Sequence, residues 1–182
     1  LVNQFINNFI TNHADGPFLV YCPLLAPHGP FVTPPGFSGL SNDHQKHRAM
    51  LEYSDGLIGT TLDLLDSLGL RDDTLIVYQS ANGWVSIRRR GDYAPRSKGT
   101  PYDAGVRSPA IYSWPARFKP AVSDALVSSV DVVPTILAAA VAAPPKTELP
   151  GMNLLPVIEG KAKLDDRVVF GETFARNVAD LD

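Results

Sequence analysis

Three polar side chains stand in loops that follow apolar runs of the sequence. His28 comes after one run, Asn82 directly after another, and Lys98 lies in the glycine-containing loop beyond Asn82. In an open α/β sheet, ligands collect beyond the carboxyl ends of the strands. An imidazole, a carboxamide and an ammonium in one crevice would suit an anionic ester, because the lysine neutralises charge and the histidine exchanges a proton. The alternative is an ordinary loop histidine, an Asn-Gly turn and a solvated lysine.

The segments around these residues predict a strand, a helix and a second strand. Residues 18–22 and 74–78 are continuous apolar runs of strand length, a pattern typical of strands buried on both faces. Between them, apolar residues recur at helical spacing over 50–68, with Asp43 as the predicted N-cap and Gly69 as the stop. This order predicts a βαβ unit, in which the two strands pair in parallel.

The rest of the chain predicts shorter elements. Helices are expected at 2–12, 131–143 and 153–159, strands within 106–114 and at 167–170, and an irregular loop at 84–105. Asp131 is the expected cap of the helix that it begins. Pro134 would lie in the first turn of that helix, where its missing N–H does no harm.

Composition places the chain among ordinary globular domains. Its length of 182 residues is enough for one domain with a sizeable core. The composition, 45% hydrophobic and 19% charged, suits a globular protein. A net charge of −3 gives no reason to expect a nucleic acid or an acidic membrane as partner. No apolar run reaches the ~18–20 residues of a membrane span, and Cys22 has no second cysteine to pair with. The first residues show no signal sequence and begin within a predicted helix, as expected of part of a longer product.

Several motifs occur in the order in which they stand in one enzyme family. The sequence A-P-H-G-P at 26–30 resembles A-P-H-x-P, and A-N-G at 81–83 resembles the end of S-D-N-G. Residues 98–109 are similar to K-G-x-x-x-E-G-G-x-R-x-P. Related segments follow at 114–115, 127–135 and 151–156. From about Pro17 to Glu172, the chain therefore resembles the C-terminal portion of a sulfatase, of the alkaline phosphatase superfamily.

This resemblance implies a fold and an activity. The fold would be α/β, a three-layer α/β/α sandwich with a mainly parallel sheet, present as one partial domain over 1–182. The activity would be hydrolysis of a small-molecule or glycan sulfate ester with a calcium ion. Its nucleophile would be formylglycine, made from the first residue of C/S-x-P-x-R. By position, His28 matches the histidine near the leaving group, Lys98 the lysine at the sulfate, and Asn82 a metal-ligand amide. Relatives of this kind are often periplasmic, secreted or lysosomal.

The chain departs from the family at two points. The segment with the nucleophile and the paired aspartates is expected before Leu1, outside this sequence. Ala81 stands where the family has aspartate. Calcium takes about six to eight oxygen ligands, and alanine supplies none, so we expect weak or absent calcium binding. We therefore expect a sulfatase-like chain that is inactive by itself and self-associates through an exposed sheet edge. The alternatives are a non-catalytic pseudoenzyme or interaction module, and a phosphoester or phosphonate hydrolase of the same superfamily.

Other residues resemble catalytic groups only superficially. Residues 113–117, S-W-P-A-R, fit the nucleophile motif, but they follow the Lys98 loop instead of preceding His28. Cys22 lacks the arginine of that motif, and we expect an inert packing group. The run at 88–90, R-R-R, could attract an anionic substrate, although a solvated loop is favoured. Asp55 and Asp103 are expected to have structural roles.

Overall fold

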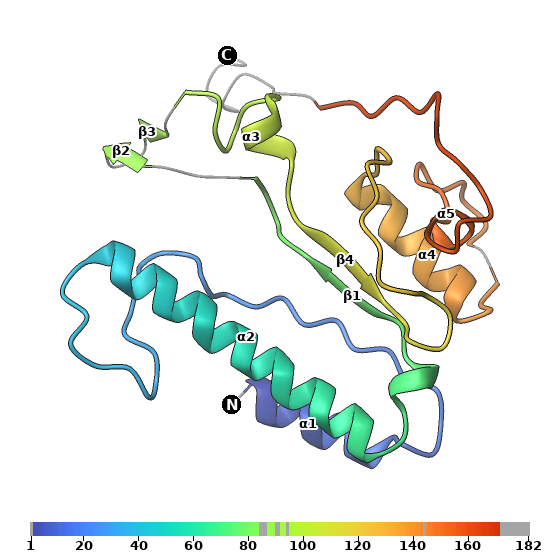
Figure 1. Cartoon of the computed structure of the whole chain (residues 1–182), viewed down its shortest axis with the longest axis horizontal. Helices are drawn as coiled ribbons and strands as arrows, with labels where there is room; N and C mark the ends of the chain where they lie inside the picture. The colour runs from blue at the N-terminus through green and yellow to red at the C-terminus, as the bar shows by residue number, and fades with distance from the viewer. Residues whose placement is uncertain (1, 84–86, 90–91, 94, 144, 172–182) are drawn as a thin grey trace. The chain divides into compact units, whose positions relative to one another are not determined.

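The computed structural model describes residues 2–83, 87–89, 92–93, 95–143 and 145–171. They fall into two compact units, Leu1–Thr74 and Leu75–Asp182 (Figure 1). Three positions named in the sequence predictions, Leu1, Arg90 and Glu172, lie outside the described residues.

Two helices form the first unit. Helix α1 (Val2–Asn12) lies beside helix α2 (Asp43–Ser67), and the short 3-10 turn η1 (Arg71–Asp73) follows (Figure 1). Polar side chains join the helices: Asn3 Nδ2 donates to Leu57 O at 2.8 Å, and Thr61 Oγ1 donates to Asn7 Oδ1 at 2.9 Å. The buried apolar residues of this unit are Ile10, Ala49, Met50 and Leu65. Both predicted helices are confirmed. They were predictable because their apolar residues recur on one face.

The ends of α2 differ slightly from the prediction. Asn42, not Asp43, is the N-cap: its Oδ1 accepts the Gln45 backbone N–H at 2.9 Å, and Asp43 is the first helical residue. The Gln45 side chain reciprocates by accepting the Ser41 N–H at 2.8 Å. At the other end, Gly69 has φ +69° and ends the helix as predicted, because a residue without Cβ adopts this conformation without strain.

The predicted strand at 18–22 is wrong. These residues have no regular secondary structure, and the side chains of Leu19 and Tyr21 are 70% and 86% exposed. An apolar run becomes a buried strand only where neighbouring strands satisfy its backbone N–H and C=O groups. The apolar composition of residues 18–22 therefore did not predict their conformation.

A two-stranded antiparallel sheet forms the first part of the second unit. Strand β1 (Ile76–Gln79) pairs with β4 (Ala110–Ser113), with Ile76 opposite Ser113. Both strands were predicted, but the parallel pairing expected of residues 74–78 was wrong. Within 84–105, predicted as an irregular loop, strands β2 (Ile87–Arg89) and β3 (Asp92–Tyr93) pair, and helix α3 (Asp103–Val106) follows. The predicted strand at 167–170 is not formed. Among the described residues each sheet has two strands, so the three-layer sandwich stays a prediction.

A buried carboxylate organises the rest of the second unit. The 3-10 turn η2 (Ser129–Asp131) leads into helix α4 (Val132–Ala139), and helix α5 (Leu155–Ile158) packs nearby (Figure 1). Asp131 occupies the predicted N-cap position of α4, but its side chain makes no capping hydrogen bond to that helix. Its Oδ2 accepts the Ser128 N–H at 2.7 Å, and its Oδ1 accepts Met152 N–H at 3.0 Å and Arg167 Nη2 at 2.7 Å. Asp131 therefore ties α4 to two later segments of the chain.

The neighbours of Asp131 complete this tether. Thr135 Oγ1 donates to the Asp131 carbonyl at 2.7 Å and accepts the Leu154 N–H at 2.9 Å, and all three residues are buried. Burial acts to raise the pKa of Asp131, but the hydrogen bonds and positive charge of Arg167, with the two backbone N–H groups, lower it overall. Burial and the Asp131 charge raise the pKa of Tyr112 in β4. Because the pKa of Asp131 is lowered in the folded chain, its carboxylate is ionised at neutral pH.

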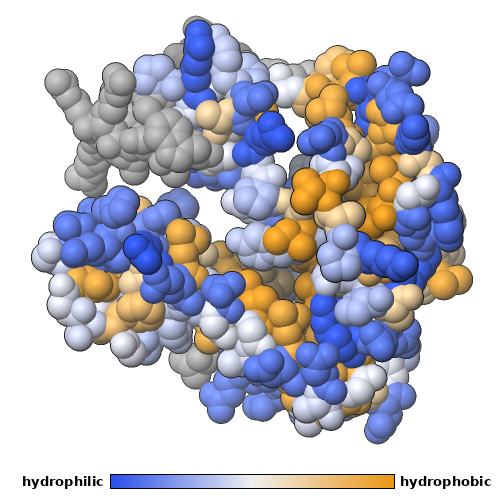
Figure 2. Space-filling model, in the orientation of Figure 1, coloured by the Kyte–Doolittle hydropathy of each residue, from blue (hydrophilic) through white to orange (hydrophobic). Residues whose placement is uncertain are grey.

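Many large apolar side chains reach the surface, where they show as orange patches among blue residues in Figure 2. Those more than 80% exposed are Tyr21, Leu25, Val122, Val141 and Phe170. No helix in the described ranges is long and apolar enough to cross a membrane.

Candidate functional site

Asn82 lies in a tight turn at the end of β1. Its Nδ2 donates to the Gly83 carbonyl at 2.7 Å, and Ser80 Oγ donates to the Asn82 carbonyl at 3.1 Å. The carboxamide oxygen is therefore the Asn82 side-chain atom that could coordinate a cation or accept from a ligand. The Ser80 N–H donates to Pro109 O at 3.2 Å, which joins the turn to the residue preceding β4.

Lys98 lies in a loop whose backbone is closely tied together. Ser97 is fully buried, and its carbonyl accepts both the N–H of Thr100 at 3.2 Å and its Oγ1 at 2.8 Å. The Arg96 guanidinium lies over the Tyr102 ring, 4.9 Å from its centroid. Lys98 is half-buried between these anchors. The loop therefore holds its lysine on a defined backbone.

Gly105 connects the Asn82 turn to the Lys98 loop. The Gly83 N–H donates to Gly105 O at 3.1 Å. On the other side, a Cβ on Gly105 would lie 2.5 Å from both Ser97 O and Thr100 O, so these backbones are in direct contact with the glycine. The structure thus brings the turn with Asn82 and the loop with Lys98 to one residue of the second unit.

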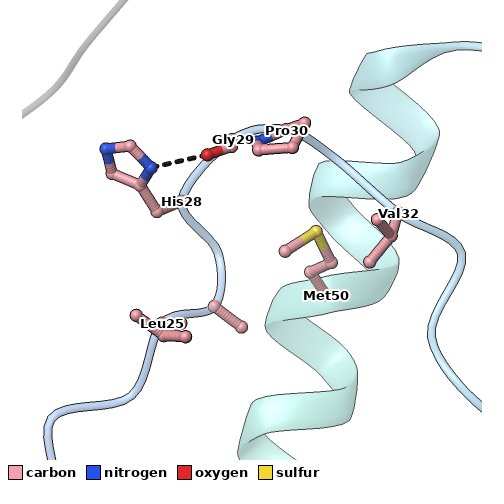
Figure 3. Close-up of a pocket in the computed structure, with 7 residues that line it drawn as sticks. Leu25, His28, Gly29, Pro30, Val32 and Met50 are labelled. Carbon is pink, nitrogen blue, oxygen red and sulfur yellow. Dashed lines mark hydrogen bonds between the residues drawn. The ribbon is translucent and has the colours of Figure 1, made fainter.

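His28 belongs to the first unit, where it follows an extended loop. Its N–H donates to Leu25 O at 2.9 Å, and its Nδ1 lies 2.7 Å from Gly29 O. Because a carbonyl only accepts, Nδ1 carries a proton in this contact, and Nε2 is the ring nitrogen available for proton exchange with a ligand. Figure 3 shows the exposed ring pointing away from Met50.

A shallow pocket of about 400 Å³ lies between the His28 loop and α2 (Figure 3). Its lining is mostly apolar: Leu25, Ala26, His28, Gly29, Pro30, Val32 and Met50. Within the first unit, His28 is therefore a lining residue of this pocket. The approach of His28 to Asn82 and Lys98 stays a prediction.

The residues around Asn82 do not fit a calcium ion. Ala81 is exposed and offers no side-chain donor, and Asn82 offers one neutral amide oxygen. Calcium takes about six to eight oxygen ligands, with carboxylates prominent among them. In the described part of the chain, no group of three or more histidine, cysteine, aspartate or glutamate residues is placed to hold a metal.

The S-W-P-A-R segment has a structural role. Ser113 pairs with Ile76 as the last residue of β4, and the Arg117 guanidinium lies 4.7 Å from the centre of the Trp114 ring. Arg117 also forms an ion pair with Glu159, beside α5. The ion pair joins the segment after β4 to the end of α5, so the charge of Arg117 is engaged and this segment does not present a nucleophile with a supporting arginine.

The last three residues considered as catalytic groups are Cys22, Asp55 and Asp103. Cys22 is half-buried, and burial raises the pKa of its thiol, which disfavours the reactive thiolate. Asp55 is exposed on α2. Asp103 begins α3, where its carbonyl accepts the Arg107 N–H at 2.7 Å. The carboxylate group of Asp103 is on an exposed residue.

A family comparison accounts for this set of loops. The family model named Sulfatase matches residues 1–142, more than three quarters of the chain. The chain belongs to the sulfatase family. Human arylsulfatase A is 32% identical over 160 residues, which cover 86% of this chain and 31% of the relative. Human N-acetylgalactosamine-6-sulfatase is 34% identical over 174 residues, covering 92% and 32%. The chain spans about a third of the length of these relatives.

Solved structures agree with this assignment. A protein from work on the metabolism of multiple glycosaminoglycans by Bacteroides thetaiotaomicron is 28% identical, with a TM-score of 0.74 over 88% of this chain and 36% of its own. A phosphonate monoester hydrolase from Silicibacter pomeroyi is 30% identical, with a TM-score of 0.55 over 73% and 27%. Both have the alkaline-phosphatase-like fold, and each sheet among the described residues of this chain has two strands.

Gly105 and the Asp131 tether were not identified from the sequence. Gly105 had been visible only as one letter of the K-G-x-x-x-E-G-G-x-R-x-P pattern. Ser128 and Asp131 fit the S-x-x-D pattern of a capping box, and this signal predicts their mutual hydrogen bonds. No spacing rule links Asp131 to Arg167, because 36 residues separate them.

Proposed function

We propose that this chain is the part of a sulfuric ester hydrolase that supplies His28, Asn82 and Lys98 to the active site. The sulfatase match over residues 1–142 is the observation that carries the proposal. In the proposed site, Lys98 stabilises the negative charge of the sulfate group. His28 protonates the leaving oxygen, and the Asn82 carboxamide oxygen occupies the position of a metal-ligand amide.

The substrate class follows from the relatives. An N-acetylgalactosamine-6-O-sulfatase of Bacteroides thetaiotaomicron is 31% identical over 151 residues, 76% of this chain and 29% of its own. We therefore propose a small-molecule or glycan sulfate ester as substrate, bound within a three-layer α/β/α sandwich of which this chain forms a part. The exposed apolar side chains and the two-stranded β1–β4 sheet support self-association of the isolated chain.

We further propose that the chain has no turnover and no tight calcium site by itself. Sulfatases are generally metal-dependent, yet the donor set around Asn82 is one amide oxygen. A neutral amide alone does not offset the dehydration of a divalent cation. Replacing Ala81 by aspartate would restore one carboxylate, but we expect no turnover from this change, because the segment that fits the nucleophile motif, at 113–117, has its serine in β4 and its arginine paired with Glu159.

Binding and turnover test the proposal separately. The purified chain is titrated with an aryl sulfate and followed by NMR, and hydrolysis is measured with and without calcium. We expect shifts at Asn82 and Lys98 without product. Lys98→Ala should abolish binding, whereas Lys119→Ala, at an exposed lysine of the same unit, should not. Turnover would refute the inactive state. Absence of binding would refute the proposed function and leave a pseudoenzyme.

A phosphonate or phosphate ester is the second candidate substrate. The 30% identity to the phosphonate monoester hydrolase favours this alternative. The same titration with an aryl phosphonate and an aryl phosphate discriminates the two classes. If either binds at least tenfold more tightly than the aryl sulfate, the assignment passes to that ester. Tenfold corresponds to about 1.4 kcal/mol of binding free energy.

A further inference from the structure

Gly105 is enclosed by backbone on two sides. A Cβ at this position would lie 2.5 Å from the carbonyl oxygens of Ser97 and Thr100, and 3.0 Å from Thr100 Oγ1. At Gly83, a Cβ would lie 2.8 Å from the Gly105 carbonyl carbon and 2.9 Å from its oxygen. Separations this short are not tolerated between a Cβ and backbone atoms, which cannot move aside like the end of a flexible side chain.

The requirement for glycine at Gly105 comes from space, not from backbone conformation. Gly105 is a residue of helix α3, and its N–H donates to Tyr102 O at 2.7 Å. Any amino acid can adopt a right-handed helical conformation. What excludes a side chain is the Lys98 loop, which is closed by the bonds from Thr100 to Ser97 O.

The two contacts of Gly105 lead to the two candidate site residues of this unit. Its carbonyl holds the Gly83 N–H, next to Asn82, at 3.1 Å. Its Cα side faces Ser97 O and Thr100 O, which flank Lys98 in the sequence. The thickness of one glycine residue therefore separates the Asn82 turn from the Lys98 loop. A methyl group there would have to move one of them.

We propose that Gly105 is a positioning residue that sets the spacing between Asn82 and Lys98 by direct backbone packing. The inference rests on the proposed function for its catalytic meaning, since it concerns the same site. Gly105 does not touch the ester. It acts through the turn and the loop on its two sides, and Gly83 extends the same close packing toward Asn82.

Gly105→Ala tests the proposal against a matched control. Gly151→Ala places a methyl group against the Val130–Asp131 backbone, where a Cβ would lie 2.7 Å from Asp131 N, in the same unit. Both variants are crowded by backbone, but only Gly105 contacts the two loops. Folding is checked by circular dichroism. NMR then follows the Asn82 side-chain amide, the Gly83 and Thr100 N–H groups and the binding of an aryl sulfate.

We expect Gly105→Ala to shift the Asn82 amide signals, to speed hydrogen exchange at Gly83, and to weaken aryl sulfate binding by about tenfold or more. Gly151→Ala should leave all three unchanged. Equal effects of both variants, or unchanged Asn82 and Gly83 signals in Gly105→Ala, would overturn the proposal. If the wild-type chain binds no aryl sulfate, the proposed function fails. The Asn82 and Gly83 amide signals then still show whether Gly105 sets the spacing between the Asn82 turn and the Lys98 loop.

A second measurement covers the case in which Gly105→Ala does not fold. In the wild-type chain, nuclear Overhauser contacts should join the Gly105 α-protons to Thr100 and the Gly105 region to the Gly83 N–H. Gly83→Ala crowds the same junction from the other side, and should move the Asn82 signals more than those of Thr100. Absence of the wild-type contacts, or a Gly83→Ala variant with unaltered Asn82 signals, would refute the positioning role.

Discussion

Asp131→Asn removes one negative charge from the buried tether while keeping its size. The wild-type carboxylate is fully buried and accepts from Ser128 N, Met152 N and Arg167 Nη2. Removing one partner of a buried ion pair costs about 3–5 kcal/mol. Asparagine retains one acceptor oxygen, so we expect a loss of about 3 kcal/mol in the free energy of unfolding at pH 7. That is a large part of the roughly 5–15 kcal/mol that stabilises a typical domain.

Urea unfolding followed by circular dichroism measures this loss. Arg48→Ala is a suitable control, because it breaks the exposed pair with Glu52 at 2.8 Å, and exposed pairs contribute about 0–1 kcal/mol. A loss below about 0.5 kcal/mol in Asp131→Asn, the level typical of surface substitutions, would refute the tether.

The pH dependence of this loss has a defined sign. The pKa of Asp131 is lower in the folded chain than its ordinary value of about 3.9. Its stabilising contribution is therefore complete above about pH 4 and is lost as the pH falls through the lower, folded pKa. The difference between wild type and Asp131→Asn should be constant from pH 5 to 7 and narrow at pH 3. A difference that persists unchanged at pH 3 would show that ionisation of Asp131 is not its cause. In the variant, the pKa of Tyr112 should also decrease, since the Asp131 charge contributes to raising it.

Three further results are expected. Asn42→Ala should cost about 1 kcal/mol of stability by removing the N-cap of α2, whereas Gly56→Ala, in open space on the same helix, should add up to about 1 kcal/mol; urea unfolding measures both. A gain in stability from Asn42→Ala, or a loss from Gly56→Ala, would contradict the α2 assignment. Calorimetry should detect no micromolar calcium binding to the chain, and such binding would overturn the argument from Ala81. Light scattering should show self-association, which a monodisperse monomer would contradict.

The helical part of the fold could be predicted because its causes are local. Apolar residues at helical spacing identified α1 and α2, and Gly69 marked the end of α2. Asn42 was missed by one position, because asparagine and aspartate are both good caps and stand side by side. The prediction of a strand at residues 18–22 was wrong for the opposite reason, because a strand depends on partners far away in the sequence. Apolar composition alone does not supply them.

The candidate site was predictable only as far as its side chains carry recognisable chemistry. Lys98 and Asn82 stood out through their types and their loops, and the structure brings those two loops to Gly105. Gly105 itself has no side chain to suggest a role, and a single sequence does not distinguish a glycine needed for space from one in a flexible loop. The link from Asp131 to Arg167 was likewise invisible, because it depends on how α4 and the later segments pack.

The convergence of three donors on one carboxylate has an evolutionary consequence. Ser128 and Met152 donate through backbone N–H groups, which substitution leaves in place, whereas Arg167 donates through its side chain. The effect of a substitution at position 167 therefore depends on which residue occupies position 131. Once aspartate is lost there, Arg167 no longer has its buried counter-charge, and its own replacement by a neutral residue becomes nearly free or even favourable. Positions 131 and 167 should therefore drift as an epistatic pair, with the first change restricting which second changes survive.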